Sequence, residues 1–162
     1  MFAFPTEFIE DEKKHTASIN VSCKDFLNGE MIPAKYTCDG QNVNPPLTIG
    51  MLPDETQSLV LIVQDPDAQV NTWVHWLVWN IVPTHKIAVN SVPGMQGINS
   101  FGVPGYCGPC PPAYGTHRYF FRVYALNAFL KLPAEATKET IEKAVAKHIV
   151  GFGELIGLYK RK

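Results

Sequence analysis

The pattern of apolar and polar positions along the chain predicts a mainly β protein. Residues 58–64 (SLVLIVQ) form a continuous apolar run, and residues 72–82 (TWVHWLVWNIV) are rich in aromatic and β-branched side chains. Both patterns favour buried strands. Residues 117–126 (HRYFFRVYAL) predict a third strand, and residues 17–23 and 154–159 are shorter strand candidates.

The two-residue period of a strand separates the side chains of residues 117–126 into two faces. His117 and Tyr119 fall on one face, together with Phe121 and Val123. Arg118 falls on the other, so we expect it to make a structural salt bridge instead of joining His117 and Tyr119.

One helix is predicted near the carboxyl end. Thr137 can cap residues 138–149 (KETIEKAVAKHI), where apolar residues recur at helical spacing. By contrast, residues 83–116 contain six glycines and six prolines in 34 positions. This segment is predicted to hold no regular element, and a loop of such length in a small domain is usually functional.

Size and charge narrow the class of protein. A chain of 162 residues suits one domain, and its net charge of −1 gives no basic surface for nucleic acid. The apolar runs are much shorter than the roughly 20 residues of a membrane-spanning helix. The first residues carry acids and a proline where a signal peptide would need a basic start, so we expect a cytoplasmic protein with no transmembrane segment.

The four cysteines raise the question of redox chemistry. In a reducing compartment free thiols are the default for a chain of this length, although a disulfide remains possible. Cys107 and Cys110 form a C-G-P-C tetrapeptide, as in thiol oxidoreductases, but Pro111 and Pro112 follow at once and prevent the usual helix start. Cys107 and Cys110 could supply two zinc ligands, but the sequence has no second C-x-x-C or C-x-x-H pair to complete the site. We favour a stiff, polyproline-like wall whose glycine amides make an anion cradle.

Polar side chains gather at the ends of the predicted strands. Asp65 and Asp67 close the first, His75 lies in the second, and His117 and Tyr119 begin the third. Imidazole, phenol and backbone N–H groups are donors suited to a phosphoryl group, and Asp65 can accept from one imidazole. The set predicts an anion site whose affinity falls as pH rises through the histidine pKa values.

Four blocks in this order resemble the signature of the phosphatidylethanolamine-binding protein family, in its bacterial and archaeal branch of Raf kinase inhibitor-like proteins. They are residues 36–47 (YTCDGQNVNPPL), 65–69 (DPDAQ), 73–80 (WVHWLVWN) and 105–126 (GYCGPCPPAYGTHRYFFRVYAL). The resemblance runs from about residue 17 to the end. It implies a single domain over residues 1–162 with an amino-terminal extension at 1–15, folded as an antiparallel β-sandwich of two sheets with a few peripheral helices.

The resemblance also implies a pocket for phosphate-like anions, including phospholipid head groups. Gln69, Asn44 and Ile49 depart from the family's usual proline, serine and tryptophan, which puts the ligand in question. Trp76 and Tyr106 are further candidates for the pocket walls. The residues implied to bind the ligand are Asp65, Asp67, Trp73, His75, Cys110, Pro111, Pro112, His117 and Tyr119.

The function expected from these observations is that of a binding module without a cofactor, metal or catalytic residue. It would hold a phosphate-bearing small molecule or head group, and the family resemblance adds a kinase or protease as a possible protein partner. An alternative is a metal-dependent or acid–base enzyme that uses Asp65, His75 and His117. A thiol oxidoreductase acting through Cys107 and Cys110 is the third hypothesis.

Overall fold

The computed structural model describes residues 16–161 and confirms the mainly β fold class, with two sheets and one α-helix. A single-turn 3₁₀ helix, η1, covers Ala34–Tyr36, and the α-helix, α2, covers Lys138–Val145. The strands are β1 (Ala17–Ser18), β2 (Val21–Ser22), β3 (Leu47–Ile49), β4 (Ser58–Asp65), β5 (Trp73–Ile81), β6 (Lys86–Ile87), β7 (Met95–Gln96), β8 (His117–Leu126) and β9 (Ile149–Tyr159).

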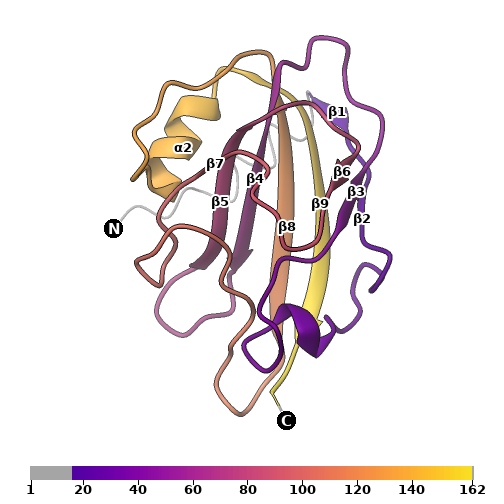
Figure 1. Ribbon diagram of the computed structural model, residues 1–162, viewed down its shortest axis with the longest axis vertical. Helices are drawn as coiled ribbons and strands as arrows, with labels where there is room; N and C mark the ends of the chain where they lie inside the picture. The colour runs from indigo at the N-terminus through magenta and orange to yellow at the C-terminus, as the bar shows by residue number, and fades with distance from the viewer. Residues whose placement is uncertain (1–15, 162) are drawn as a thin grey trace.

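The larger sheet has the order β1-β9-β8-β4-β5-β7, and the smaller has the order β2-β3-β6 (Figure 1). All neighbours pair antiparallel except β1, which runs parallel to β9. The long strands β4, β5, β8 and β9 therefore form the centre of the molecule. Among residues 16–161 no helix is long and apolar enough to span a membrane.

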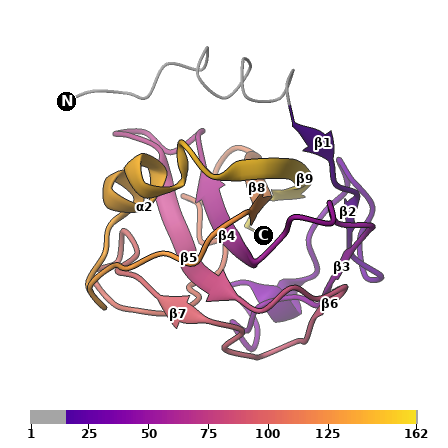
Figure 2. The same cartoon turned by 90° about the horizontal axis from the view of Figure 1, so that it is seen from above.

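Both faces of the larger sheet are buried, which explains the continuous apolar run in β4. Leu59, Leu61 and Val63 point into the core between the two sheets, whereas Val60 and Ile62 belong to a second core that includes Ile141 and Val145 of α2. Figure 2 shows α2 and the smaller sheet on opposite sides of the larger one. A strand covered on both sides needs apolar residues at every position, not at alternate positions.

The elements match the predicted ones at the long strands. Strand β8 covers residues 117–126 as expected, and Thr137 caps α2 by accepting a hydrogen bond from the Thr140 amide at 3.4 Å. The helix ends earlier than predicted, because the chain turns at residues 146–148 and enters β9. The segment 83–116 holds the two-residue strands β6 and β7, so the expectation of no regular element there is wrong.

The two terminal segments differ most from expectation. Residues 17–23 form two short strands, one in each sheet, and β9 begins five residues before the predicted start at residue 154. The glycines within β9 break the apolar pattern that would predict a strand. One of them, Gly153, is required by the close approach of Ile19. A Cβ at Gly153 would collide with the carbonyl oxygen of Ile19. The predicted extension at residues 1–15 lies outside the described residues.

Candidate functional site

Three strand ends bring the predicted site residues to one edge of the larger sheet. Asp65 at the end of β4 pairs with Trp73 at the start of β5. On the other side of β4, Val63 pairs with Phe121, so the first residues of β8 lie beside the last residue of β4. Antiparallel pairing thus gathers side chains that are about 50 positions apart in sequence, as the interpretation of the strand ends predicted.

A cavity of about 260 Å³ lies at this edge. Eight of the nine predicted ligand-binding residues line it. The full lining consists of Asp65, Ala68, Gln69, Val70, Trp73, His75, Phe101, Cys110, Pro111, Pro112, His117 and Tyr119.

Asp67, the ninth predicted residue, does not line the cavity. Its carboxylate accepts hydrogen bonds from the backbone N–H, Nε and Nη2 of Arg118, each at 2.9 Å. The side-chain hydrogen bond from Arg118 holds the pKa of the Asp67 carboxyl below its usual value. Asp67 therefore lies outside the cavity lining that holds the other eight residues, whereas the predicted structural salt bridge of Arg118 is confirmed.

Asp65 and His117 form a buried pair in the cavity wall. His117 Nδ1–H donates to Asp65 Oδ2 at 2.6 Å, and the two side chains are only 12% and 5% exposed. The other oxygen, Asp65 Oδ1, accepts from the Asp67 amide at 2.7 Å and is fixed by that turn. The pair fixes the ring of His117 so that Nε2 is the nitrogen left for a ligand.

His75 is held by the Gly/Pro-rich loop. Its Nδ1 lies 2.6 Å from the carbonyl oxygen of Cys107, and a carbonyl can only accept, so Nδ1 carries a proton. Burial lowers the pKa of His75 below its usual value, against the opposing effects of the Cys107 carbonyl and the Asp65 charge. The neutral ring therefore offers Nε2 as an acceptor, which differs from the N–H donor expected of this residue.

Tyr119 carries a polar group with no hydrogen-bond partner among the described residues. The side chain is fully buried, and its hydroxyl is near Asp65 without reaching it in hydrogen-bond geometry. Burial, followed by the charges of Asp65 and Asp67, raises the pKa of Tyr119, so the hydroxyl keeps its proton. A buried polar group without a partner costs about 1–3 kcal/mol, which makes this hydroxyl a candidate ligand contact.

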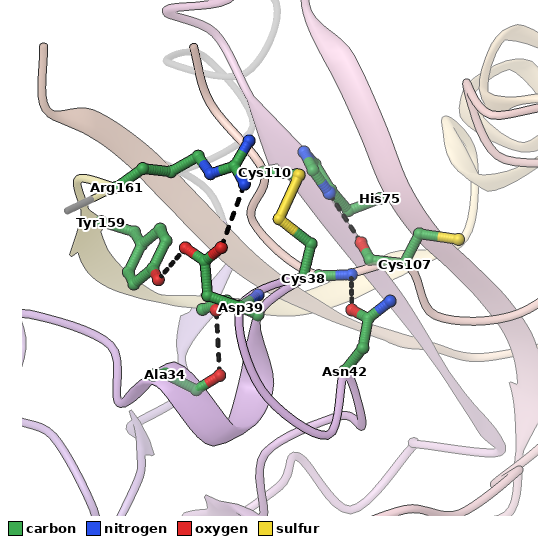
Figure 3. The surroundings of a disulfide bond; sticks show 11 residues. Ala34, Cys38, Asp39, Asn42, His75, Cys107, Cys110, Tyr159 and Arg161 are labelled. Carbon is green, nitrogen blue, oxygen red and sulfur yellow. Dashed lines mark hydrogen bonds and ion pairs between the residues drawn. A yellow bond between two sulfur atoms is a disulfide. The ribbon is translucent and has the colours of Figure 1, made fainter. Parts of the chain in front are cut away.

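A disulfide ties the Cys110–Pro112 wall of the cavity to the segment around η1. Cys38 and Cys110 are bonded, with their Cα atoms 5.4 Å apart (Figure 3). Cys23 and Cys107 are free. The default expectation of free thiols is therefore wrong for Cys38 and Cys110. No helix starts at Cys107, as expected from Pro111 and Pro112. Cys107 also forms no disulfide with Cys110, which is bonded to Cys38.

The expected cradle of backbone amides is smaller than predicted, because the protein itself uses most of them. The Cys107 amide donates to the carbonyl of His75 at 3.0 Å, and the Gly108 amide donates to Asn42 Oδ1 at 2.7 Å. The three prolines at 109, 111 and 112 have no N–H. From residues 107–112 this leaves the Cys110 amide, for which no acceptor is described within 16–161.

Sequence reasoning missed four lining residues, and two of its suggested walls lie elsewhere. Phe101 contacts the rings of both Trp73 and His75 edge-on, at 5.5 Å between centroids, but a lone aromatic in a glycine-rich loop gives no sequence signal. Trp76 and Tyr106 pack against each other away from the cavity lining. The other missed residues, Ala68, Gln69 and Val70, belong to the loop after β4.

The site lacks the arrangement of a metal centre. Within residues 16–161 no group of three or more histidine, cysteine, aspartate or glutamate side chains is placed to hold a metal ion. Asp65 and His117 are bonded to each other, and Nδ1 of His75 is bonded to a carbonyl. The cavity therefore presents donors and acceptors to a ligand and not a set of metal ligands.

Comparisons with known proteins agree with the fold. A UPF0098 protein of Pyrococcus abyssi is 49% identical over 147 residues, which is 85% of this chain and 83% of that protein. The structure of a phosphatidylethanolamine-binding protein homologue from Chlamydia trachomatis has a TM-score of 0.86 at 38% identity, covering 91% of this chain and 100% of that one. YbcL of Escherichia coli, described as a new member of the mammalian PEBP family, has a TM-score of 0.83 at 27% identity, covering 90% and 100%. The family model for phosphatidylethanolamine-binding proteins matches residues 22–160, and the chain therefore belongs to this family.

Proposed function

We propose that the cavity beside β4, β5 and β8 binds a phosphomonoester, either free or as the head group of a phospholipid. The observation that carries the proposal is the hydroxyl of Tyr119, which is buried beside the Asp65–His117 pair and has no hydrogen-bond partner within residues 16–161. A protein gains nothing from such a group in the empty state, because its desolvation is not compensated. A ligand acceptor would supply the missing hydrogen bond.

The hydrogen-bonding groups of the cavity favour a phosphoryl group that carries one proton. Tyr119 offers an O–H donor, and His117 turns Nε2 toward the ligand, an N–H donor in the form of the ring that carries both protons, while Nδ1–H stays on Asp65. His75 Nε2 is an acceptor, since its Nδ1–H is engaged by Cys107. Phosphoryl oxygens can accept from the first two groups, and a P–OH can donate to the third.

The size of the cavity supports a head group and not a whole lipid. Ligand pockets in proteins are commonly about 300–1,000 Å³, and this one is about 260 Å³. Trp73 and Phe101 add apolar surface, and Phe101 is 44% exposed. We therefore expect phosphoethanolamine to bind in full, and acyl chains to remain outside.

Titration calorimetry with phosphoethanolamine tests the proposal. Asp65→Asn removes the charge that positions His117, whereas Asp67→Asn removes a neighbouring carboxylate that lies outside the cavity. We expect Asp65→Asn to weaken binding at least about tenfold, and Asp67→Asn to keep the wild-type affinity. No binding by the wild type, or equal losses in both variants, would contradict the proposal.

The proposal is for binding without turnover. The ligand should therefore be recovered unchanged after incubation with the protein, which ³¹P NMR can follow over hours. Release of inorganic phosphate at a rate that Asp65→Asn abolishes would favour the acid–base enzyme instead. An effect on a kinase or protease partner, which the family resemblance implies, stays a prediction that depends on occupancy of this cavity.

A further inference from the structure

The wall of the cavity formed by Cys110–Pro112 lies where an anchored segment meets an unanchored one. Residues 106–109 are held by several hydrogen bonds that do not involve a sulfur atom. They are Tyr106 Oη to the Tyr36 carbonyl at 2.7 Å, the Cys107 amide to the His75 carbonyl at 3.0 Å, the Gly108 amide to Asn42 Oδ1 at 2.7 Å, and the Cys38 amide to the Pro109 carbonyl at 3.1 Å.

Residues 110–116 have no such anchors. Within the part of the chain that the structure describes, no hydrogen bond or ion pair involves them before β8 begins at His117. Pro111 is buried, but residues 112–116 are exposed. Between Pro109 and His117, the restraints on this segment are therefore the disulfide from Cys110 to Cys38 and the packing of Pro111.

We propose that the Cys38–Cys110 disulfide controls, by its redox state, the position of the Cys110–Pro112 wall of the ligand cavity. This inference rests on the proposed function. In the oxidised form the bond holds the Cys110–Pro112 wall in the cavity that His75 and His117 also line, so the cavity is preorganised for its ligand. In the reduced form the wall is free to move away, and binding must first restore its position at a cost in affinity.

A dithiol of the thioredoxin class is the reductant that this step requires. One of its thiolates attacks a sulfur of the protein disulfide, and its second thiol resolves the mixed disulfide. The dithiol becomes a cyclic disulfide, and Cys38 and Cys110 each receive one electron and one proton as thiols. Cys110 is exposed and Cys38 is half-buried, so the bond is accessible to such a reductant.

Cys107 takes no part in the oxidised state, although it completes the C-x-x-C pattern. Asn99 Nδ2–H donates to its Sγ at 3.5 Å, and Figure 3 shows Sγ pointing away from the disulfide. Its backbone carbonyl, not its thiol, contacts the site through His75. The partner of Cys110 is thus Cys38, which is 72 positions away in sequence.

Calorimetry with phosphoethanolamine on the oxidised, dithiothreitol-reduced and reoxidised protein tests the inference. Titration of thiols defines each state, with two free thiols of the four cysteines in the oxidised chain and four after reduction. Reduction should weaken binding about tenfold or more, and reoxidation should restore it. Equal affinity in the two states, or loss of the fold on reduction by circular dichroism, would overturn the inference.

Two variants sharpen the test. Cys38→Ser should bind weakly in both buffers, whereas Cys23→Ala keeps the disulfide and should still respond to the reductant. A Cys38→Ser protein that binds as tightly as the oxidised wild type would contradict the inference. If Cys38→Ser does not fold, the wild-type redox series remains the test.

The mobility of the wall separates this inference from the proposed function. If no phosphomonoester binds in either state, the proposed function fails. ¹⁵N relaxation at residues 113–116 still tests whether the disulfide restrains this segment. Lower order parameters on reduction would support it. Unchanged order parameters would overturn it, whatever the ligand.

Discussion

Replacing Tyr119 by phenylalanine should change stability and affinity in opposite directions. The hydroxyl is buried and has no hydrogen-bond partner among the described residues. Removing an unsatisfied buried polar group recovers its desolvation penalty, about 1–3 kcal/mol. We therefore expect Tyr119→Phe to raise the free energy of unfolding of the ligand-free protein by about 1–3 kcal/mol.

The same substitution removes a hydrogen bond to the ligand. Hydrogen bonds to charged groups contribute about 1.5–3 kcal/mol, which corresponds to about a 10- to 150-fold rise in the dissociation constant. Urea unfolding without ligand measures the first effect, and calorimetry with phosphoethanolamine measures the second. A variant that is less stable than the wild type, or that binds equally well, would refute the reasoning.

Tyr106→Phe is the matched control for stability. Tyr106 is half-buried, and its hydroxyl donates to the carbonyl of Tyr36 at 2.7 Å. Its removal leaves that acceptor without its partner and should lower stability by about 1–3 kcal/mol. The two tyrosines should thus shift the urea midpoint in opposite directions.

Three further predictions concern stability. Reducing the Cys38–Cys110 bond, whose residues are 72 positions apart, should lower the free energy of unfolding by about 4 kcal/mol, because the disulfide limits the chain entropy of the unfolded state. Urea unfolding with and without reductant measures this change, and a change below about 1 kcal/mol would contradict the prediction. Because burial lowers the pKa of His75, the unfolded chain binds a proton that the folded chain does not, so stability should fall as pH drops below about 6.5, by up to about 1.4 kcal/mol per pH unit. An unaltered slope in His75→Phe would show that another group is responsible. Gly153→Ala should lower the melting temperature by separating β1 from β9, since its Cβ would collide with the Ile19 carbonyl, and an unchanged melting temperature would contradict that contact.

The long strands and the residues at their ends could be predicted, because apolar runs and the two-residue alternation of side chains are visible in the local sequence. The parity of β8 placed His117 and Tyr119 together and Arg118 apart, as found. Asp67 follows Asp65 by two residues and could not be separated from it by position alone. Only the turn geometry shows that Asp65 faces the cavity and Asp67 faces Arg118.

The disulfide and the protonation state of His75 could not be predicted. Cys38 and Cys110 meet only because the segment around η1 packs against the Gly/Pro-rich loop, a contact that no local pattern records. His75 is a non-donor at Nε2 because a loop carbonyl 32 residues away engages Nδ1. Both features depend on long-range contacts and not on residue type.

A crystal structure of the protein with phosphoethanolamine tests the central claim most directly. We expect the phosphoryl group within hydrogen-bond distance of Tyr119 Oη, His117 Nε2 and His75 Nε2, with the Asp65–His117 pair intact. A phosphoryl group bound elsewhere, with the Tyr119 hydroxyl still unpartnered, would contradict it.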